Sequence, residues 1–535
     1  MNNRQFRILA VTAIVFAGLF SLMSSFVYGM SNDKPMLLVT RSRAPLADDS
    51  GRFRVVQNKV QWNPKETAII ICDMWNQHWC KGATQRVAEL APYMNEVVSK
   101  ARDKGVLIIH SPSGTIGFYA DHPARKRAQD APKASNLPDG IGKWCNWIDE
   151  NEKAAGYPID HSDGGCDCEP TCKQGPPWPW KSQIDTIEIK SDEDAISDSG
   201  EEIWNLLAQY GVKNAILMGV HTNMCVLGRP FGLRNLAKSG MNVVLMRDLT
   251  DTMYNSKMRP VVSHFTGTDL VVEHVEKYVC PTITSTVFSG KPAFCFKNDK
   301  RPRVVFMSAE SEYGAVETLP EFAHELQIKY GLYCEILQGS TEKDGNDRHE
   351  LAGLEALTNA DLAVLFMRRR SLAPEQMQYF RDYLNRGGAL IGLRTASHAL
   401  DSRGNAPEGN AEWPKLDPEV LGGNYHGHHG SGPICTVTAA AGATGHPIMA
   451  GVKLPLTSNG SLYEVRPLGE STTRLLVGTI PDQEPEPVAW TNQYKQSRIF
   501  YTSLGHPDDF RIAPFRRMLI NAVFWAMNKP VPNVK

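Results

Sequence analysis

The chain has 535 residues, 42% of them hydrophobic, and its 57 basic and 58 acidic side chains give a formal net charge of -1. This balance gives no electrostatic basis for binding nucleic acid. At about 150 residues per domain, the length predicts two or three globular domains. The composition therefore favours small-molecule chemistry and is compatible with a homo-oligomer.

The N-terminal segment, residues 1–29, has the pattern of a secretory signal peptide. Arg4 and Arg7 precede the apolar run 8–23, and Gly29 is a small residue at the expected cleavage point. An uncleaved anchor is less favoured, because the run is shorter than the roughly 20 apolar residues that span a bilayer. We expect an exported protein, periplasmic or extracellular, with no stable membrane insertion after cleavage.

Residues 60–286 alternate strand-like apolar runs with helix-like segments, as a parallel α/β sheet does. One run ends at Asp73, and another, 214–218, leads through a glycine to Cys225. Ligands of an open α/β sheet gather at the carboxyl ends of its strands, so both residues are placed to act on a substrate. A short run that ends at Lys190 completes an ordered set of acid, lysine and cysteine.

Cys225 lies at a predicted strand-to-helix turn, where unpaired N–H groups and the helix dipole favour a thiolate. Three interpretations remain open: a catalytic nucleophile, a redox thiol, or a small buried cysteine that only packs. The upstream acid and lysine favour the nucleophile.

An insertion at 131–180 interrupts the periodic pattern and is rich in cysteine, tryptophan and proline. Its cysteines are Cys145, Cys166, Cys168 and Cys172. They could form a metal cluster or disulfides, and we favour disulfides, because the spacing matches no zinc pattern and the expected compartment is oxidising. Of the 11 cysteines in the chain, an odd number, Cys225 is the most economical one to leave unpaired.

The same insertion is expected to shape the mouth of the pocket. Its tryptophans either face the substrate or pack the loop. They are Trp144, Trp147, Trp178 and Trp180.

Three pieces, IIICDMWN, IEIKSDEDAI and GVHTNMCVLGR, resemble the isochorismatase-like cysteine hydrolases, the superfamily of nicotinamidases, N-carbamoylsarcosine amidases and ureidoacrylate amidohydrolases. The resemblance covers roughly residues 60 to 285. It implies a catalytic aspartate at Asp73, a lysine at Lys190 and a nucleophile at Cys225. It also implies a cis peptide bond between Val220 and His221.

The chemistry that this resemblance implies is hydrolysis of a C–N bond in a small amide or carbamoyl compound. Asp73 would take the proton of Cys225, and the thiolate would form a thioester, with the N–H groups of His221 and Cys225 holding the oxyanion. Lys190 would orient the carboxylate. Vinyl-ether hydrolysis, the reaction of isochorismatases proper, is disfavoured by the presence of Cys225.

No metal or other cofactor is expected in this unit. Nicotinamidases of the superfamily bind a metal through an aspartate and histidines, but the Asp-x-His pattern that supplies them is missing here. His78 and His122 are therefore interpreted as pocket-lining or structural.

After a polar linker at 287–302, a second α/β pattern occupies residues 303–528. Strand-like runs at 303–308, 333–337 and 360–366 alternate with helix-like segments. The expected fold is α/β, with two doubly wound parallel-sheet, three-layer α/β/α domains in tandem.

The second unit resembles the ThuA-like, or trehalose-utilisation, family, whose fold is related to class I glutamine amidotransferases. The pieces GGALIGLRTASHAL, GGNYHGHHGSGP, GHPI and YTSLGHPDDFRIAPFRRMLINAVFWAM carry the resemblance. Amidotransferases have a cysteine on the turn after the first of these strands, but here that turn reads Leu393-Arg394-Thr395-Ala396. Amidotransferase chemistry is therefore not expected.

The family's fold would bring polar side chains from three turns of this unit to one strand end, where they suit hydrogen bonds to sugar hydroxyls, proton transfer or a metal. They are His398, His426, His428, His429, His506 and Asp508. The resemblance to a family associated with sugar metabolism implies a saccharide ligand. The alternative function is thus a carbohydrate-binding or carbohydrate-processing protein whose first domain is idle. A solvated glycine-rich loop that happens to hold histidines is the other interpretation.

Overall fold

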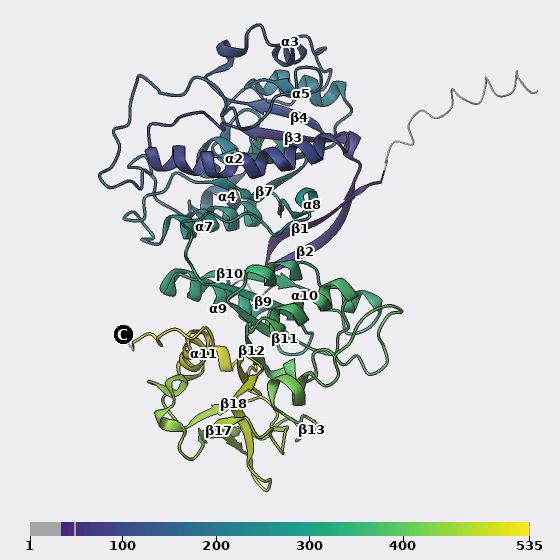
Figure 1. Ribbon diagram of the computed structural model, residues 1–535, viewed down its shortest axis with the longest axis vertical. Coiled ribbons are helices and arrows are strands. Elements are labelled where there is room, and N and C mark those ends of the chain that lie inside the picture. The colour runs from purple at the N-terminus through teal and green to yellow at the C-terminus, as the bar shows by residue number, and fades with distance from the viewer. Residues whose placement is uncertain (1–33, 48–49, 534–535) are drawn as a thin grey trace, which may run out of the picture.

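The computed structural model describes residues 34–47 and 50–533, so the expected signal peptide at 1–29 lies outside the described residues. Two α/β units, each with its own sheet, are stacked along the long axis of the molecule (Figure 1). In the described ranges, no helix has both the length and the apolar character needed to cross a membrane. The expected two-domain α/β architecture is confirmed.

The first unit contains an eight-stranded sheet of order β2-β1-β8-β7-β6-β3-β4-β5. Its strands are β1 (Met36–Pro45), β2 (Phe53–Trp62), β3 (Thr67–Cys72), β4 (Leu107–Ser111), β5 (Ala195–Ile196), β6 (Asn214–Val220), β7 (Asn242–Asp251) and β8 (Thr282–Ile283). Six of them, from β8 to β5, are parallel to their neighbours, whereas β1 pairs antiparallel with β2 and β8. The sheet is therefore mixed, because a hairpin that precedes the expected boundary at residue 60 adds to its edge.

Helices cover both faces of this sheet, as the alternation of buried side chains along its strands requires. In β3, Ile69 and Ile71 belong to the core under α2 (Lys81–Arg102) and α8 (Thr286–Ser289), whereas Ile70 belongs to the opposite core. That opposite core is covered by α3 (Pro123–Gln129), α5 (Gly200–Gln209), α6 (Leu233–Lys238) and α7 (His264–Tyr278), and α4 (Glu150–Ala155) lies within the insertion. The result is the expected three-layer arrangement.

The second unit contains a nine-stranded sheet of order β10-β9-β11-β12-β19-β18-β17-β14-β15. Its strands are β9 (Arg303–Ala309), β10 (Tyr333–Gln338), β11 (Leu362–Met367), β12 (Ala389–Leu393), β14 (Cys435–Ala439), β15 (Leu456–Ser458), β17 (Thr473–Thr479), β18 (Glu486–Tyr494) and β19 (Ser497–Thr502), and β13 (Gly427–His428) pairs with β16 (Tyr463–Glu464) separately. The strands from β10 to β19 run parallel, and those from β18 to β15 pair antiparallel. The second sheet is therefore mixed, because short connections rather than crossover helices join its later strands.

The helices of the second unit also lie on both faces of its sheet. Side chains of α9 (Ala315–Tyr330) and α11 (Ala513–Ala526) belong to one hydrophobic core. Side chains of α10 (Pro374–Asn385) belong to the other.

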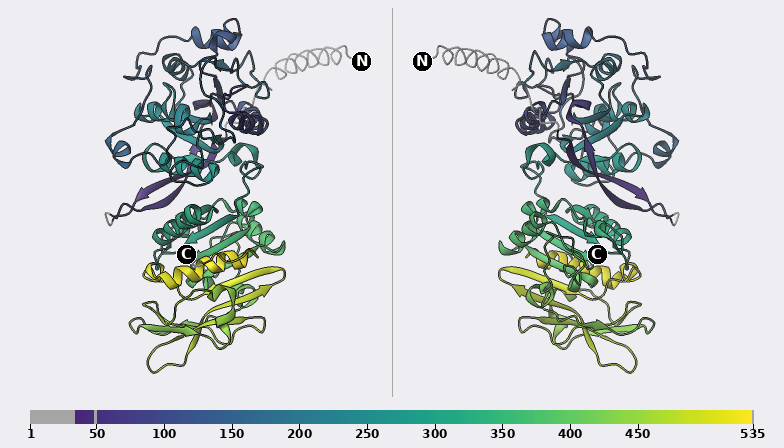
Figure 2. Two further views of the ribbon diagram at one scale, coloured as in Figure 1. Left: turned by 90° about the vertical axis from the view of Figure 1, so that its left-hand side faces the viewer. Right: turned by 90° about the vertical axis from the view of Figure 1, so that its right-hand side faces the viewer.

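The β1–β2 hairpin reaches from the first unit onto the second (Figures 1 and 2). Val55 of β2 is buried in the core beneath α9, and the backbone N–H of Gln338 donates to Gln57 Oε1 at 2.6 Å. Lys59 pairs with Glu350 at 3.0 Å. The hairpin thus belongs to one sheet and helps to close the core of the other unit.

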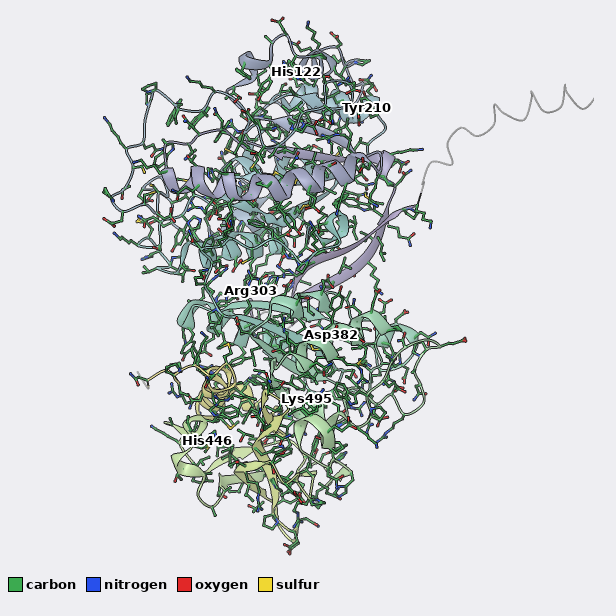
Figure 3. All side chains as sticks on the ribbon, viewed as in Figure 1. His122, Tyr210, Arg303, Asp382, His446 and Lys495 are labelled. Atoms are coloured by element: carbon green, nitrogen blue, oxygen red, sulfur yellow. The ribbon has the colours of Figure 1, made fainter. Side chains whose placement is uncertain are left out.

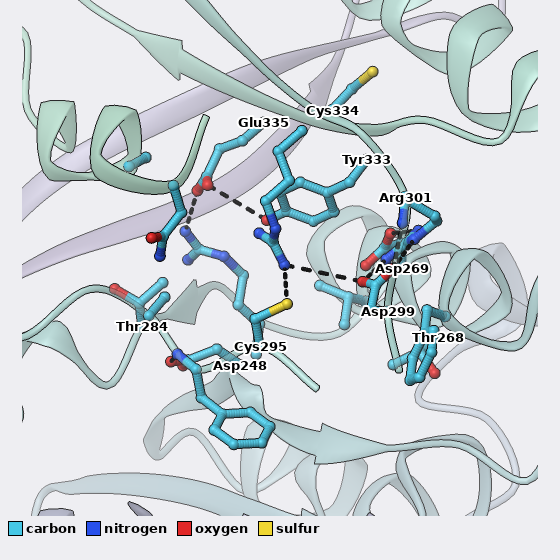
Figure 4. A pocket seen from close by; sticks show the side chains of 18 of the residues that line it. Asp248, Thr268, Asp269, Thr284, Cys295, Asp299, Arg301, Tyr333, Cys334 and Glu335 are labelled. Carbon is cyan, nitrogen blue, oxygen red and sulfur yellow. Dashed lines mark hydrogen bonds and ion pairs between the residues drawn. The ribbon is translucent and has the colours of Figure 1, made fainter. Parts of the chain in front are cut away.

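Charged side chains line a cavity of about 120 Å³ at the junction of the two units, where Arg303 lies (Figures 3 and 4). Arg247 of β7 pairs with Glu335 of β10 at 3.0 Å. Arg301 of the linker pairs with Asp269 of α7 at 2.6 Å and with Asp299 at 2.8 Å. The partly buried ion pair with Asp269 therefore fixes the linker to the first unit.

Candidate active site

Asp73 and Cys225 are brought together by neighbouring parallel strands of the first sheet. Strands β3 and β6 pair in a register that sets Cys72 opposite Gly219. Asp73 directly follows β3, and Cys225 lies in the helical turn η3 (Thr222–Val226) that follows β6. Both side chains therefore lie at the carboxyl edge of the sheet, as their positions in the sequence predict.

The Asp73 carboxylate is fully buried and held on both oxygens. Its Oδ1 accepts the backbone N–H of Ser113 at 2.7 Å, and its Oδ2 accepts Nε and Nη2 of Arg229 at 3.2 and 3.1 Å. Burial raises the pKa of Asp73, while Arg229, Cys225 and Ser113 oppose that rise. A carboxyl group with a raised pKa can both accept and return a proton near neutral pH.

The thiol of Cys225 is 7% exposed and lies within hydrogen-bonding reach of Asp73. Burial raises its pKa and the Asp73 charge adds to the rise, whereas Arg229 and the backbone N–H of His221 lower it. The expectation that the helix terminus favours a thiolate was therefore wrong for the protein without substrate. Desolvation and the neighbouring carboxylate raise the pKa of Cys225 by more than a single helical turn lowers it. The proton therefore stays on sulfur until Asp73 removes it.

Lys190 lies away from this site, which corrects the expectation that it orients Asp73. Its ammonium group pairs with Glu188 at 2.7 Å, and 42% of its side chain is exposed. Residues 187–190 form no strand, because the chain turns at Lys190, whose N–H donates to Asp194 Oδ2 at 2.7 Å. The edge strand β5 begins only at Ala195.

Arg229 supplies the positive charge beside Asp73, and sequence reasoning did not assign it a role. It lies four residues after Cys225, and its backbone N–H donates to the Cys225 carbonyl at 3.0 Å. One helical turn thus carries the side chain back to the carboxylate. The available signal was this spacing of four residues within the GVHTNMCVLGR segment.

The turn that carries Cys225 is fixed at its start by His221. The peptide bond between Val220 and His221 is cis, as the resemblance implied. The His221 carbonyl accepts the N–H groups of Met224 and Val226 at 3.0 and 3.2 Å, and its own N–H is directed at the Cys225 sulfur. The backbone of His221 therefore faces the reacting atom.

Aromatic rings of the insertion lie close to this turn. Trp180 stacks on Trp75 at 4.6 Å and on Trp178 at 4.9 Å, and the ring of His78 lies 5.6 Å from Trp180 and 5.0 Å from His221. Burial lowers the pKa of His78 to about 4, so its ring is neutral at pH 7. These stacked rings therefore lie next to His221, at the start of the turn that carries Cys225.

Trp144 and His122 lie outside this stack of rings. Trp144 is 45% exposed and lies under the guanidinium of Arg229, 5.7 Å from ring to carbon. His122 caps the start of α3, where Nδ1 accepts the N–H of Ala124 at 3.2 Å. His122 therefore has a structural position, whereas Trp144 borders the site.

In the second unit, two of the expected site histidines gather around aromatic rings. His398 ends the turn η6 (Arg394–His398) after β12, and its ring stacks on Tyr425 at 4.5 Å. The rings of His398 and His428 lie 6.1 and 6.2 Å from Tyr463. Burial and nearby arginines keep the pKa of His398 well below its usual range, so it is neutral.

The remaining expected residues of this unit have other contacts. His506 and Asp508 follow β19 and lie 3.4 Å from each other, and Asp508 accepts Asn459 Nδ2 at 2.9 Å. His426 is exposed, with Nε2 3.7 Å from Glu464. The ring of His429, 3.8 Å from the same carboxylate, lines a surface hollow with His426.

Arg394 lies against Tyr463, in the first of these two groups, and was not among the expected site residues. It begins the turn η6 directly after β12, with a left-handed φ of 42°. Its guanidinium lies 4.0 and 4.9 Å from the ring centres of Tyr313 and Tyr463, and Nη1 donates to the Ser503 carbonyl at 2.7 Å. A non-glycine residue in this backbone region often marks a functional turn.

Comparison with known proteins gave no match among curated proteins. Among solved structures, the chain is similar to a putative ThuA-like protein from Parabacteroides merdae ATCC 43184, with 16% identity, 44% of this chain and 93% of that chain covered, and a TM-score of 0.34. It is also similar to a cysteine hydrolase from Pseudomonas syringae pv. phaseolicola 1448A (17% identity, 42% and 91% covered, TM-score 0.26). An isochorismatase family protein from Desulfovibrio vulgaris subsp. vulgaris str. Hildenborough has 15% identity, 42% and 97% covered, and a TM-score of 0.23. The second unit, residues 303–526, matches the family model ThuA, described as trehalose utilisation.

Proposed function

We propose that the first unit hydrolyses a C–N bond of a small amide or carbamoyl compound through a thioester on Cys225. The observation that carries this proposal is the contact set of Asp73. Its buried carboxylate is within reach of the Cys225 thiol and is held by Ser113 and Arg229. A nucleophile, a base and a group that orients the base are the parts that covalent catalysis needs.

The first half of the reaction forms the thioester. Asp73 takes the proton of Cys225 while the sulfur attacks the carbonyl carbon, and the carbonyl oxygen becomes an oxyanion that the N–H groups of His221 and Cys225 stabilise. The C–N bond then breaks as Asp73 returns the proton to the leaving nitrogen. Before the attack, Arg229 keeps the Asp73 carboxylate unprotonated and oriented.

The second half releases the product. Asp73 takes a proton from water, the resulting hydroxide attacks the thioester, and the C–S bond breaks. The proton on Asp73 then returns to sulfur, so the enzyme regains its starting state. The same carboxyl group serves both halves because its pKa lies above its usual range.

The test is release of ammonia or amine from a panel of small amides, carbamoyl compounds and ureides. Wild-type protein is compared with Cys225→Ala and with Cys280→Ala, a control of matched burial at 8% exposure. We expect loss of about 10³-fold or more for Cys225→Ala, the scale at which nucleophile deletions act, and little change for the control. Full activity in Cys225→Ala would refute the proposal.

A second candidate function belongs to the second unit, where we propose a saccharide ligand. Arg394 and His398 lie against the rings of Tyr463 and Tyr425, a mixture of polar and aromatic groups that suits small polar ligands. Calorimetric titration with trehalose and simple sugars tests it, with Tyr425→Ala as the variant expected to lose binding. Equal binding by Tyr425→Ala would exclude this site.

Export is also a proposal, based on the signal-peptide pattern of residues 1–29. Fractionation of the native host should recover the protein outside the cytoplasm. Its N-terminal sequence should begin after Gly29.

A further inference from the structure

Four cysteines from two distant parts of the chain lie together at the start of α2. Cys80 immediately precedes this helix, whereas Cys166, Cys168 and Cys172 come from the insertion. The sulfurs of Cys80, Cys166 and Cys168 all lie within 4.8 Å of one another. Cys172 packs against the same cluster, and its sulfur accepts the N–H of Lys81 at 3.5 Å.

The spacing of these sulfurs differs from that of a disulfide. All 11 cysteines lie in the described residues and are free, and the sulfurs of Cys80 and Cys168 are 3.7 Å apart, against about 2.05 Å in a disulfide. Two sulfurs bound to one tetrahedral zinc ion at about 2.3 Å lie about 3.8 Å apart. The prediction that the insertion cysteines form disulfides is therefore not met in the structure, and Cys145, whose sulfur donates to the Trp147 carbonyl, lies outside the cluster.

Backbone N–H groups surround the sulfurs of the cluster. The N–H of Gly82 donates to the Cys168 sulfur at 3.2 Å, and backbone N–H groups of Ala83, Cys168 and Cys172 face the other sulfurs. The cluster lies at the N-terminus of a long helix, and the nearby Arg86 guanidinium pairs with Asp167, between two of the cysteines, at 3.2 Å and with Asp251 at 2.7 Å. N–H donors of this kind stabilise the negative charge that sulfur carries when it binds a metal.

From these contacts we propose that Cys80, Cys166, Cys168 and Cys172 bind one zinc ion. A set of four thiolates in a closed, tetrahedral arrangement is typical of structural rather than catalytic zinc. The ion would join the insertion to the start of α2. Met224, the residue before the candidate nucleophile, packs against this cluster, so the site would also support the turn that carries Cys225.

The first test measures zinc in the full chain purified without chelator. We expect about one zinc per chain, as one closed Cys₄ site requires, in wild type and in Cys145→Ser, a control from the same insertion. Cys168→Ser should lose most of the metal. Zinc-free wild-type protein in which peptide mapping shows the cluster cysteines joined by disulfides would overturn the proposal.

Cobalt provides a readout that does not depend on the folding of a variant. Wild-type protein is freed of zinc with a chelator under reducing conditions and titrated with Co²⁺. Tetrahedral thiolate coordination gives intense visible bands, which we expect to saturate at one equivalent and to disappear on adding zinc. Absence of these bands in a folded, reduced protein would reject the site.

Limited proteolysis tests the structural role. Lys173 and Lys181 of the insertion region are exposed, and removal of zinc should speed tryptic cleavage after them by loosening the backbone, whereas restored zinc should slow it. Unchanged cleavage with and without metal would show that the ion does not hold the insertion.

Discussion

Replacing Arg229 with methionine should move the acid limb of the pH–rate profile upwards. Arg229 provides two charge-assisted hydrogen bonds to Asp73, at 3.1 and 3.2 Å, and the Asp73 side chain is fully buried. Burial already raises the pKa of Asp73, and the guanidinium opposes that rise. Without Arg229 the pKa rises further, and Asp73 is protonated, hence unable to act as a base, at a higher pH.

The size of the shift follows from the geometry. A guanidinium in contact lowers the pKa of a carboxyl group by about 1–3 units, which corresponds to about 1.4–4 kcal/mol. Because 28% of the Arg229 side chain is exposed, water screens part of its charge, and we expect the lower half of that range, about 1–2 units.

The assay is kcat/KM against pH on the substrate that the amide panel identifies. Arg229→Lys is the matched variant, because it keeps the charge but loses the two-pronged contact, and its acid limb should move less than that of Arg229→Met. An Arg229→Met enzyme that remains active with its acid limb in the wild-type position would refute the role assigned to Arg229.

Three further predictions concern groups away from this contact. Lys190→Ala should change kcat/KM by less than about threefold, because the exposed Lys190 ammonium group pairs with Glu188. A loss as large as that of Cys225→Ala would show that Lys190 takes part in catalysis. Burial raises the pKa of Glu276, but the charges of Arg41 and Arg43 outweigh burial and hold this pKa at about 2. The ionised Glu276 therefore stabilises the fold fully above about pH 4.5, and this stabilisation is lost as pH falls through about 2. Urea unfolding should show a loss of about 3 kcal/mol over that range that Glu276→Gln lacks, and equal pH slopes would contradict this. Burial raises the pKa of Asp417 to about 7, so its stabilisation is complete below about pH 3.8 and is lost as pH rises through 7. Asp417→Asn should remove a decline of up to about 4 kcal/mol in the unfolding free energy between those values, and a decline that persists in the variant would assign it to another group.

Most of the framework could be predicted because buried parallel strands are continuous apolar runs. The runs at 66–73 and 214–218 became β3 and β6, and the first residues after such strands were the natural candidates for chemistry. Asp73 and Cys225 were found in this way. The cis bond at His221 came from the resemblance alone.

The predictions that were wrong or missing have a common cause: each feature depends on three-dimensional packing that the sequence pattern does not show. The alternating run Ile187-Glu188-Ile189 suggested a strand, but Lys190 is drawn into a turn by Asp194. The β1–β2 hairpin precedes the expected unit and joins the sheet only through long-range pairing. Cys80 was not grouped with the insertion cysteines because the whole of α2, β4 and α3 separate them in sequence.

The β1–β2 hairpin determines where the chain can be cut into stable fragments. A fragment that begins at residue 303 would leave the core beneath α9 without Val55 and leave Gln338 without its partner on β2. A fragment that ends at residue 302 would expose Val55 to water on a protruding ribbon. The two units therefore do not behave as independent modules. A fusion or a domain swap between homologues should transfer β1 and β2 together with the unit whose core they cover.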